Sequence, residues 1–258
     1  INGFSGTITQ SANMTITNSG GKSGNYSQSS VVLFTATDPG TNTFSATGSF
    51  SVTAGIFRRY TGLGISSDPF VIYDVYGLQG MKTATTSSFK LNNDIDATVT
   101  SGWSSGAGFD PIGNATLPFT GIFDGDNRVI SNLYISTTSV NYVGLFGYST
   151  NIIKNVTLTS VSIVATSTTG TAGTAGSAGT SSGTPTAGGT GTAGTAGGNI
   201  YVGAIVGYSR GTISNVGVTG NVSGIGGTGG AAGNAGAGGN TTTGATTALD
   251  NSKSQLNA

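Results

Sequence analysis

Two pairs of aspartates are the residues best placed by type and spacing to do chemistry. Asp94 and Asp96, like Asp124 and Asp126, are separated by one residue, so on a strand both carboxylates of a pair would share a face. Paired carboxylates can bind Ca²⁺ or act as acid and base on a polysaccharide, and Arg128 follows closely. Asp-Gly-Asp-Asn is also an ordinary turn sequence. The sequence favours a turn over a calcium site, and a calcium site over a catalytic one.

The composition of the 258 residues excludes several classes of function. The chain has no Cys, no His and no Glu, which removes disulfides and nucleophile–histidine sites. Nine basic residues balance nine aspartates, so no positive field for nucleic acid is expected. No apolar run is long enough to predict a membrane span. The chain starts at Ile1 without a signal peptide, as a mature or trimmed product would, and its composition favours an extracellular or cell-surface location.

A short motif, Ile-x-Asn followed by Leu or Val, organises the second half of the chain. It places Asn132, Asn155 and Asn215 in equivalent positions, 23 and then 60 residues apart, and Asn93 fits the same position. A period near 23 residues predicts a solenoid, and we expect an all-β parallel β-helix. An amide side chain both donates and accepts, so stacked asparagines could bond from one rung to the next. The alternative is a set of ordinary surface turns.

In the second half of the chain, outside the Ile-x-Asn motifs, glycine recurs at every third residue. Such a period predicts threefold helices of polyproline II type with glycine along one edge. We expect polyglycine-II-like helices packed through these edges, with a turn near Pro185 in the first insertion. The alternative is a flexible linker. The glycines concerned are Gly170, Gly173, Gly176, Gly179, Gly188, Gly191, Gly194, Gly197, Gly224, Gly227, Gly230, Gly233, Gly236 and Gly239.

These patterns divide the chain into four parts. Residues 1–60 alternate apolar and Ser/Thr residues, as in a β-rich segment or small β-domain. Residues 61–96 hold a junction, a capping helix with Asp74 as its N-cap, and the first solenoid strand. Residues 97–223 form the solenoid with a glycine-rich insertion at 165–199, and 224–258 a second tract and a tail. Arg59 is expected to serve an interface or hydrogen bonds, and Trp103 to pack over the solenoid end or stack on a sugar.

The order of motifs between residues 68 and 223 resembles the GLUG-repeat surface proteins. The lead-in of that family is matched by residues 69–72 with 77–79, then by 91–96 and 119–125. Its repeat is matched by residues 143–147 and 202–207, each followed by the Ile-x-Asn motif. Leu145-Phe146 and Ala204-Ile205 depart from the usual glycine and aliphatic pair. The resemblance implies a secreted bacterial or archaeal protein with a β-helical fold and an adhesive or cell-surface role.

The expected function is therefore structural and adhesive, without catalysis, in a filament, sheath, surface layer or adhesin. The expected partners are further copies or neighbouring surface proteins, with glycans as a further class, and no nucleic acid. No cofactor is expected apart from the calcium alternative. One alternative is a carbohydrate- or receptor-binding module that uses the glycine-rich helices, with ice binding disfavoured by the irregular threonines. Another is a polysaccharide-active β-helix enzyme.

Overall fold

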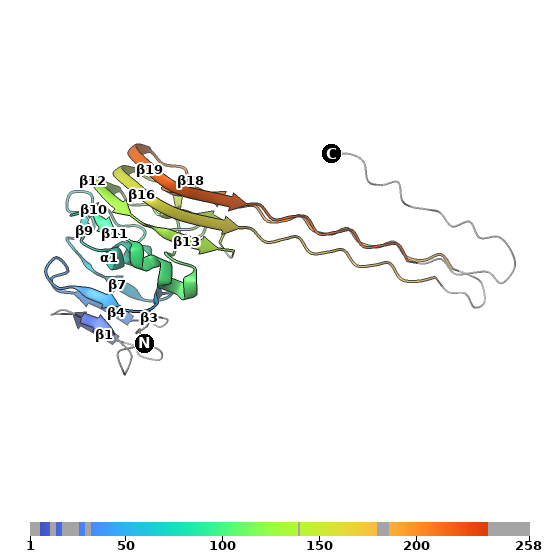
Figure 1. Ribbon diagram of the computed structural model, residues 1–258, viewed down its shortest axis with the longest axis horizontal. Helices are drawn as coiled ribbons and strands as arrows, with labels where there is room; N and C mark the ends of the chain where they lie inside the picture. Colours follow the sequence, from blue (N-terminus) through green and yellow to red (C-terminus); the bar gives the residue numbers. More distant parts are fainter. Residues whose placement is uncertain are drawn as a thin grey trace. The chain divides into compact units, whose positions relative to one another are not determined.

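The structure is a computed structural model that describes residues 6–10, 14–16, 26–28, 32–138, 140–179 and 186–236 (Figure 1). The chain forms two compact units. The first contains Ile1–Ser167 and Asn199–Gly226, and the second contains Thr168–Gly198 and Gly227–Ala258. The first unit consists mainly of β-strands with few helices. Pro185 and Gly239 lie outside the described residues.

The first unit begins with short strands that repeat in sets of three. The strands are β1 (Gly6–Gln10), β2 (Met14–Ile16), β3 (Tyr26–Gln28), β4 (Val32–Ala36), β5 (Phe44–Ala46) and β6 (Phe50–Val52). Each strand of the first set pairs in parallel with its counterpart in the second, β1 with β4, β2 with β5 and β3 with β6. We call one such circuit of the chain a rung. The β7 strand (Ile56–Arg58) pairs in parallel with β4 and begins the next rung.

The core of these first rungs is continuous with the rest of the unit. The Phe34 and Phe57 rings stack at 4.5 Å, and the Phe50 ring lies 4.8 Å from the Trp103 ring. Trp103 is completely buried and also packs on Tyr76. The structure thus gives no domain boundary at residue 60. Packing was the favoured prediction for Trp103 and is confirmed, although the indole lies inside the core and not over an end; its burial excludes the alternative of sugar stacking.

The middle of the unit carries its helices. It contains β8 (Tyr60–Thr61), β9 (Phe70–Ile72), α1 (Val75–Gly80), η1 (Met81–Thr83), β10 (Phe89–Leu91), β11 (Ile95–Asp96) and η2 (Thr98–Gly106). The Asp74 side chain accepts the Gly77 amide at 2.7 Å, which confirms it as the N-cap of α1. All six residues of α1 are buried, and strands of earlier and later rungs lie on both sides of it (Figure 1). The helix is therefore internal and does not cap an end of the stack.

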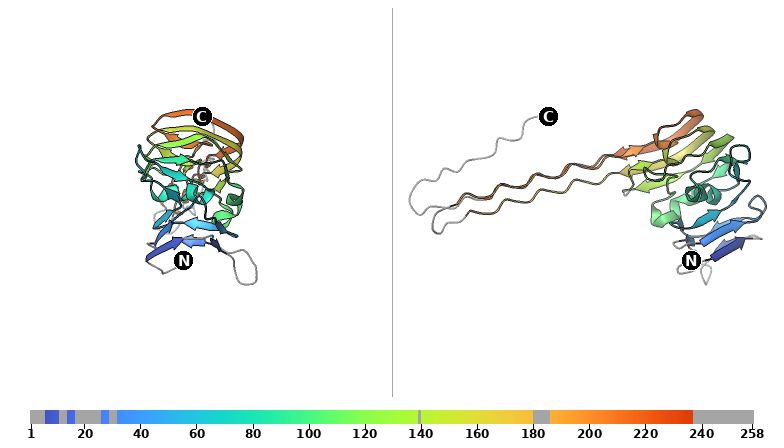
Figure 2. Two further views of the ribbon diagram at one scale, coloured as in Figure 1. Left: turned by 90° about the vertical axis from the view of Figure 1, so that its left-hand side faces the viewer. Right: turned by 180° about the vertical axis from the view of Figure 1, so that it is seen from behind.

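The later strands pair in parallel, and three of them, β12, β16 and β19, are long. They are β12 (Phe123–Ser131), β13 (Tyr134–Thr137), β14 (Tyr142–Val143), β15 (Phe146–Ser149), β16 (Ile153–Thr166), β17 (Tyr201–Val202), β18 (Val206–Ser209) and β19 (Ile213–Ile225). Phe123 pairs with Ile153, and Ile153 pairs with Ile213. The spacings are 30 and 60 residues, and Thr168–Gly198 of the second unit accounts for the excess. Figure 2 shows these strands stacked along one side of the unit.

The predicted 23-residue rung is therefore wrong. Ile130 pairs with Leu158, not with Ile153. The motif at Asn132 therefore lies at a different corner of the rung from the motifs at Asn155 and Asn215. Their likeness reflects a shared turn chemistry, since Asn132, Asn155 and Asn215 all have positive φ, a conformation that Asn tolerates. The insertion also begins later than residue 165, because Ala165 and Thr166 are still part of β16.

The second unit contains three extended segments, 168–179, 186–198 and 227–236, joined by hydrogen bonds at every third residue. The first donates to the third from Gly170, Gly173 and Gly176. The third donates to the second from Gly230, Gly233 and Gly236, and the second donates back to the first from Thr192, Thr195 and Gly198. The first and third segments run parallel and the second runs antiparallel to both, and Figure 2 shows their traces side by side. The three segments thus close a ring of interactions.

Close backbone contact explains the glycine period of this unit. A Cβ built at Gly173 would lie 1.9 Å from the Thr192 oxygen, and one at Gly233 would lie 1.9 Å from the Thr174 oxygen. Threonines line the outside, where the hydroxyl oxygens of Thr171 and Thr195 lie 3.0 Å apart. Gly224 was wrongly assigned to this pattern, because it belongs to β19 of the first unit.

Candidate functional site

The aspartate pair at residues 124 and 126 stabilises a corner of the rung. The Asp124 Oδ1 atom accepts the Asn155 side-chain amide and the Asp126 backbone amide, both at 2.9 Å. Its Oδ2 atom pairs with Lys154 at 3.1 Å, and Asp126 pairs with Lys90 at 3.2 Å. Asp126 has positive φ within a register shift of β12 against β16. Both carboxylates thus hold the turn that the sequence favoured.

The second pair, Asp94 and Asp96, also serves neighbouring turns. The Asp94 carboxylate accepts the Val129 amide at 2.8 Å. The Asp96 carboxylate accepts the hydroxyl and amide of Thr98 and the side-chain amide of Asn132. Among the described residues, no group of three His, Cys, Asp or Glu side chains could hold a metal ion. The calcium alternative therefore has no ligand cluster to support it in this part of the chain.

A short column of asparagines connects successive rungs. The Asn215 side-chain amide donates to Asn155 Oδ1 at 2.9 Å and to Asn127 Oδ1 at 3.0 Å. Asn155 in turn donates to Asp124. The sequence placed Asn155 and Asn215 correctly in one column, but missed Asn127, whose only signal was its position in the Asp-Gly-Asp-Asn turn. Such hydrogen bonds contribute about 1 kcal/mol each.

The other two predicted members of the column lie elsewhere. Asn132 occupies a different corner, where it donates to Asp96. Asn93 donates to the backbone oxygens of Tyr73 and Asp94 and does not contact the column. Both asparagines therefore stabilise individual turns.

The corner carboxylates predict a loss of stability in acid. Burial alone would raise the pKa of Asp124, but the Asp126 amide, Asn155 and Lys154 outweigh it and hold the pKa below its ordinary value. Hydrogen bonds from Thr98 and Asn132 likewise lower the pKa of Asp96. A lowered folded-state pKa stabilises the fold above the unfolded value of about 3.9, and this stability is lost as pH falls through the folded value.

The free energy of unfolding in urea should therefore fall between pH 5 and pH 3. In Asp124→Asn the decline should be shallower, because one of the linked groups is gone. Lys154→Met removes the charge partner and keeps the carboxylate, so it separates the ion pair from the amide bonds. Identical pH slopes for the wild-type chain and Asp124→Asn would contradict this assignment.

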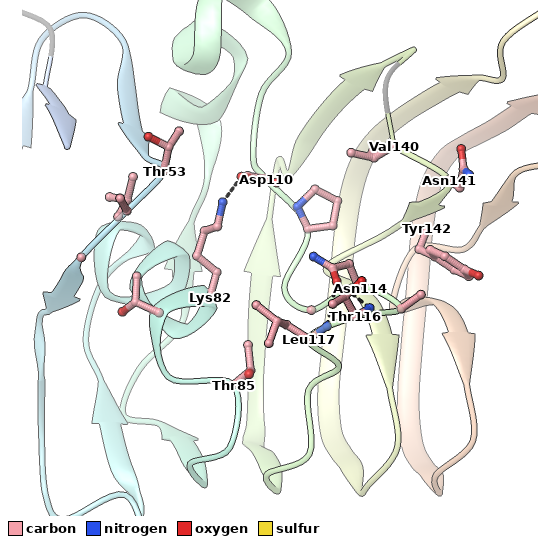
Figure 3. A pocket seen from close by; sticks show the side chains of 17 residues that line it. Thr53, Lys82, Thr85, Asp110, Asn114, Thr116, Leu117, Val140, Asn141 and Tyr142 are labelled. Atoms are coloured by element: carbon pink, nitrogen blue, oxygen red, sulfur yellow. Dashed lines mark hydrogen bonds and ion pairs between the residues drawn. The ribbon is translucent and has the colours of Figure 1, made fainter. Parts of the chain in front are cut away.

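An open groove of about 600 Å³ lies in the first unit (Figure 3). Its walls come from segments far apart in the sequence: 52–55 after β6, 82–85 in and after η1, 110–117 before β12, and 140–142. The lining mixes uncharged polar side chains, mainly threonine and asparagine, with apolar ones such as Val52, Leu117 and Val140. The Lys82 and Asp110 side chains form an ion pair within it. No sequence motif predicted this groove.

The floor of the groove is held in place by two sets of hydrogen bonds. The side chain of buried Gln79 donates to the backbone carbonyl oxygen of Asp110 and accepts the backbone amide of Asp110, both at 2.8 Å. The Asn114 side chain accepts the amides of Thr116 and Leu117. These contacts fix the loop before β12 against α1. The groove is thus largely pre-formed, as ligand sites generally are.

One end of the groove meets a surface cluster of four tyrosines. Tyr142 lines the groove and stacks on Tyr201, with ring centres 5.1 Å apart and nearly parallel planes. Tyr148 lies 4.9 Å from Tyr208 in the same pair of rungs. Tyr142 and Tyr201 precede the repeated runs 143–147 and 202–207, and Tyr148 and Tyr208 follow them, but no motif predicted their common face. Exposed aromatic faces with hydroxyl groups can bind both apolar and hydrogen-bonding partners.

Comparisons with known proteins give two relatives. The chain is 34% identical over 214 residues to Halomucin of Haloquadratum walsbyi, which covers 78% of this chain and 2% of that protein. It is 30% identical over 102 residues to a protein described as a Gly-rich membrane protein of Evansella cellulosilytica, covering 38% of this chain and 12% of the relative. The chain thus spans a small part of each relative's length. No family model and no solved structure matches it, and the GLUG resemblance stays a prediction.

Proposed function

We propose that this chain is a structural and adhesive module of a cell-surface protein and acts without catalysis. The observation that carries the proposal is the three-segment bundle of the second unit, whose hydrogen bonds recur at every third residue. A bundle that is mostly glycine, alanine and threonine has no ionisable side chain to do chemistry in the described segments. It suits a rigid projection that presents a polar surface.

The proposal includes a finer description of both units. The first unit is a parallel β-solenoid, supported by the in-register pairing of β12, β16 and β19 and of the N-terminal rungs. The second is a polyglycine-II-like bundle, supported by its three-residue hydrogen-bond repeat and by glycines that admit no Cβ. Repeating units of this kind form extended and rigid scaffolds.

The names of the two relatives support the location. One is named Halomucin and the other is described as a Gly-rich membrane protein, and both are far longer than this chain. Modules of long proteins at the cell boundary commonly serve structure and adhesion, which accords with the small share of charged residues, 7%. Among the described residues, no helix of this chain has the length and apolar character needed to cross a membrane.

The location is testable on cells of the source organism. Antibodies against the whole chain should label intact cells as strongly as permeabilised ones, and label should be lost when surface proteins are shaved with protease. Purified chain coated on beads should also hold the beads to these cells. Labelling that requires permeabilisation would contradict the proposal.

A second candidate function is carbohydrate binding in the groove of the first unit. The observation that favours it is the combination of a half-buried aromatic ring, Tyr142, with the side-chain amides of Asn114 and Asn141 in the lining of the groove. Neutral sugars are recognised by stacking on aromatic faces and by planar hydrogen-bonding groups. A glycan array would test it: binding that Tyr142→Ala weakens at least tenfold supports the groove, and binding that Tyr142→Ala leaves unchanged excludes it.

A further inference from the structure

The last strand of the first unit presents its core-facing side chains to solvent. Val216, Val218 and Val222 pair with Val156, Leu158 and Ile163 of β16. The three β16 residues are completely buried, whereas the three β19 valines are 37%, 44% and 41% exposed. In the described part of the chain β19 pairs with β16 alone, so its outer backbone edge is open. An edge of this length with an apolar row is a strong site for pairing with another chain.

The opposite end of the stack is closed by polar side chains. Buried Gln10 donates to the Thr43 oxygen at 2.8 Å, and buried Gln28 donates to the Ala54 oxygen at 2.9 Å. The Tyr26 hydroxyl donates to Gln28 Oε1. The described parts of the two ends therefore differ, with buried amides in the first set of strands and a row of valines on β19. This difference favours a contact between like ends.

The β19 sequence is instead complementary to itself. Its central residue is Thr219, in the sequence Ile-Ser-Asn-Val-Gly-Val-Thr-Gly-Asn-Val-Ser-Gly-Ile. Val216 and Val222 lie at equal distances on either side of this centre. Gly220 has φ 125° and lies at a register shift, which marks a corner of the rung at this centre. A twofold axis through the corner keeps inward side chains inward. It sets Val216 of one copy opposite Val222 of the other.

Charge does not oppose such a contact. The β19 strand has no charged residue, and within 199–226 only Arg210 is charged. Two identical surfaces without charge can approach each other without repulsion, and twofold contacts are the commonest way for identical chains to associate.

From these observations we infer that β19 is a docking edge for a second copy of this chain, paired antiparallel and tail to tail. The contact continues the core by one more rung and buries the exposed valines of both copies. It deepens the structural role in the proposed function by naming a second copy as the partner, and rests on it only in that respect.

Cysteine pairs test the register, because the chain has no native cysteine. Val216→Cys and Val222→Cys chains are prepared separately and oxidised mildly, alone and mixed. Directly facing residues of antiparallel strands have Cα atoms about 4.5–5.5 Å apart, inside the range of about 4.4–6.8 Å that a disulfide spans. The mixture should give disulfide-linked dimers at least tenfold more abundantly than either chain alone. Equal yields from the mixture and the separate chains would overturn the inference.

Sedimentation equilibrium of the unmodified chain provides the second measurement. The chain should show concentration-dependent dimers, and Val218→Asp should weaken the association at least tenfold because it places a charge in the apolar row. Ser214→Asp, which adds the same charge beside Lys154, is the matched control and should dimerise like wild type. Strictly monomeric wild-type chain would also overturn the inference. If the chain is monomeric in sedimentation but antibodies label intact cells, the dimer is excluded and the proposed surface location is retained.

Discussion

Alanine at Gly230 should open the bundle of the second unit, whereas alanine at the adjacent Gly229 should leave it intact. A Cβ at Gly230 would lie 1.9 Å from the Thr171 oxygen, but one at Gly229 would meet no atom closer than 4.0 Å. The clash forces two segments apart and breaks the bond from Gly230 to Thr195 and its neighbours. Overpacking of this kind typically costs about 1–3 kcal/mol, and each lost hydrogen bond adds about 1 kcal/mol.

The two substitutions have the same effect on the unfolded chain, so they isolate the folded bundle. Alanine at an unstrained glycine position stabilises by about 0.4–1 kcal/mol, and Gly229→Ala should therefore be neutral or slightly protective. Elastase cuts after small residues, and the alanines of residues 168–198 report opening of the bundle. Mass spectrometry should show cleavage there at least tenfold faster in Gly230→Ala than in Gly229→Ala. Equal cleavage rates would show that the segments are not packed through their glycine edges.

Replacement of Arg59 by methionine should be the most damaging single change in the first unit. The guanidinium is completely buried. It donates to Asp74 Oδ2 from Nε at 3.0 Å, to Gln10 from Nη1 and to the Asn42 oxygen from Nη2 at 3.0 Å. Removal of one partner from a buried ion pair costs about 3–5 kcal/mol, because the remaining charge loses its compensation. The junction between the first rungs and α1 depends on these bonds.

Urea unfolding of Arg59→Met should therefore show a loss in this range, against less than about 1 kcal/mol for Arg58→Met, whose guanidinium lies 5.3 Å from the centre of the Phe70 ring. Asp74→Asn added to Arg59→Met should restore part of the loss, since asparagine still caps α1 and carries no charge. A similar small effect for both arginines would contradict the role assigned to Arg59.

The parts of the architecture that could be predicted from the sequence are those in which a local structural requirement recurs along the chain. The glycine period identified the second unit, because the need for glycine at a close contact is strictly local. The Asn motif identified corners but not their register, since Asn132 and Asn155 share a positive φ at different corners. The true partner of the Asn155 corner, Asn127, lies in a turn with an unrelated sequence.

The groove and the core contacts could not be predicted in the same way. The groove joins residues from Val52 to Tyr142, and its Lys82–Asp110 pair spans two elements with no shared pattern. Trp103 lies in a run of Ser and Gly that suggests solvent, yet three-dimensional packing places it between Phe50 and Tyr76. Contacts of this kind depend on which segments lie next to each other in successive rungs, and sequence periodicity alone does not predict this register.

Residue-resolved amide hydrogen exchange tests the central claim, that the glycine-rich segments of the second unit form an ordered bundle, most directly. The amides of Gly170, Gly173, Gly176, Thr192, Thr195, Gly230 and Gly233 donate to neighbouring segments. They should exchange at least tenfold more slowly than intervening alanine amides such as Ala172 and Ala175, which gives protection with a period of three. Uniform exchange at unstructured rates across 168–179, 186–198 and 227–236 would contradict the account.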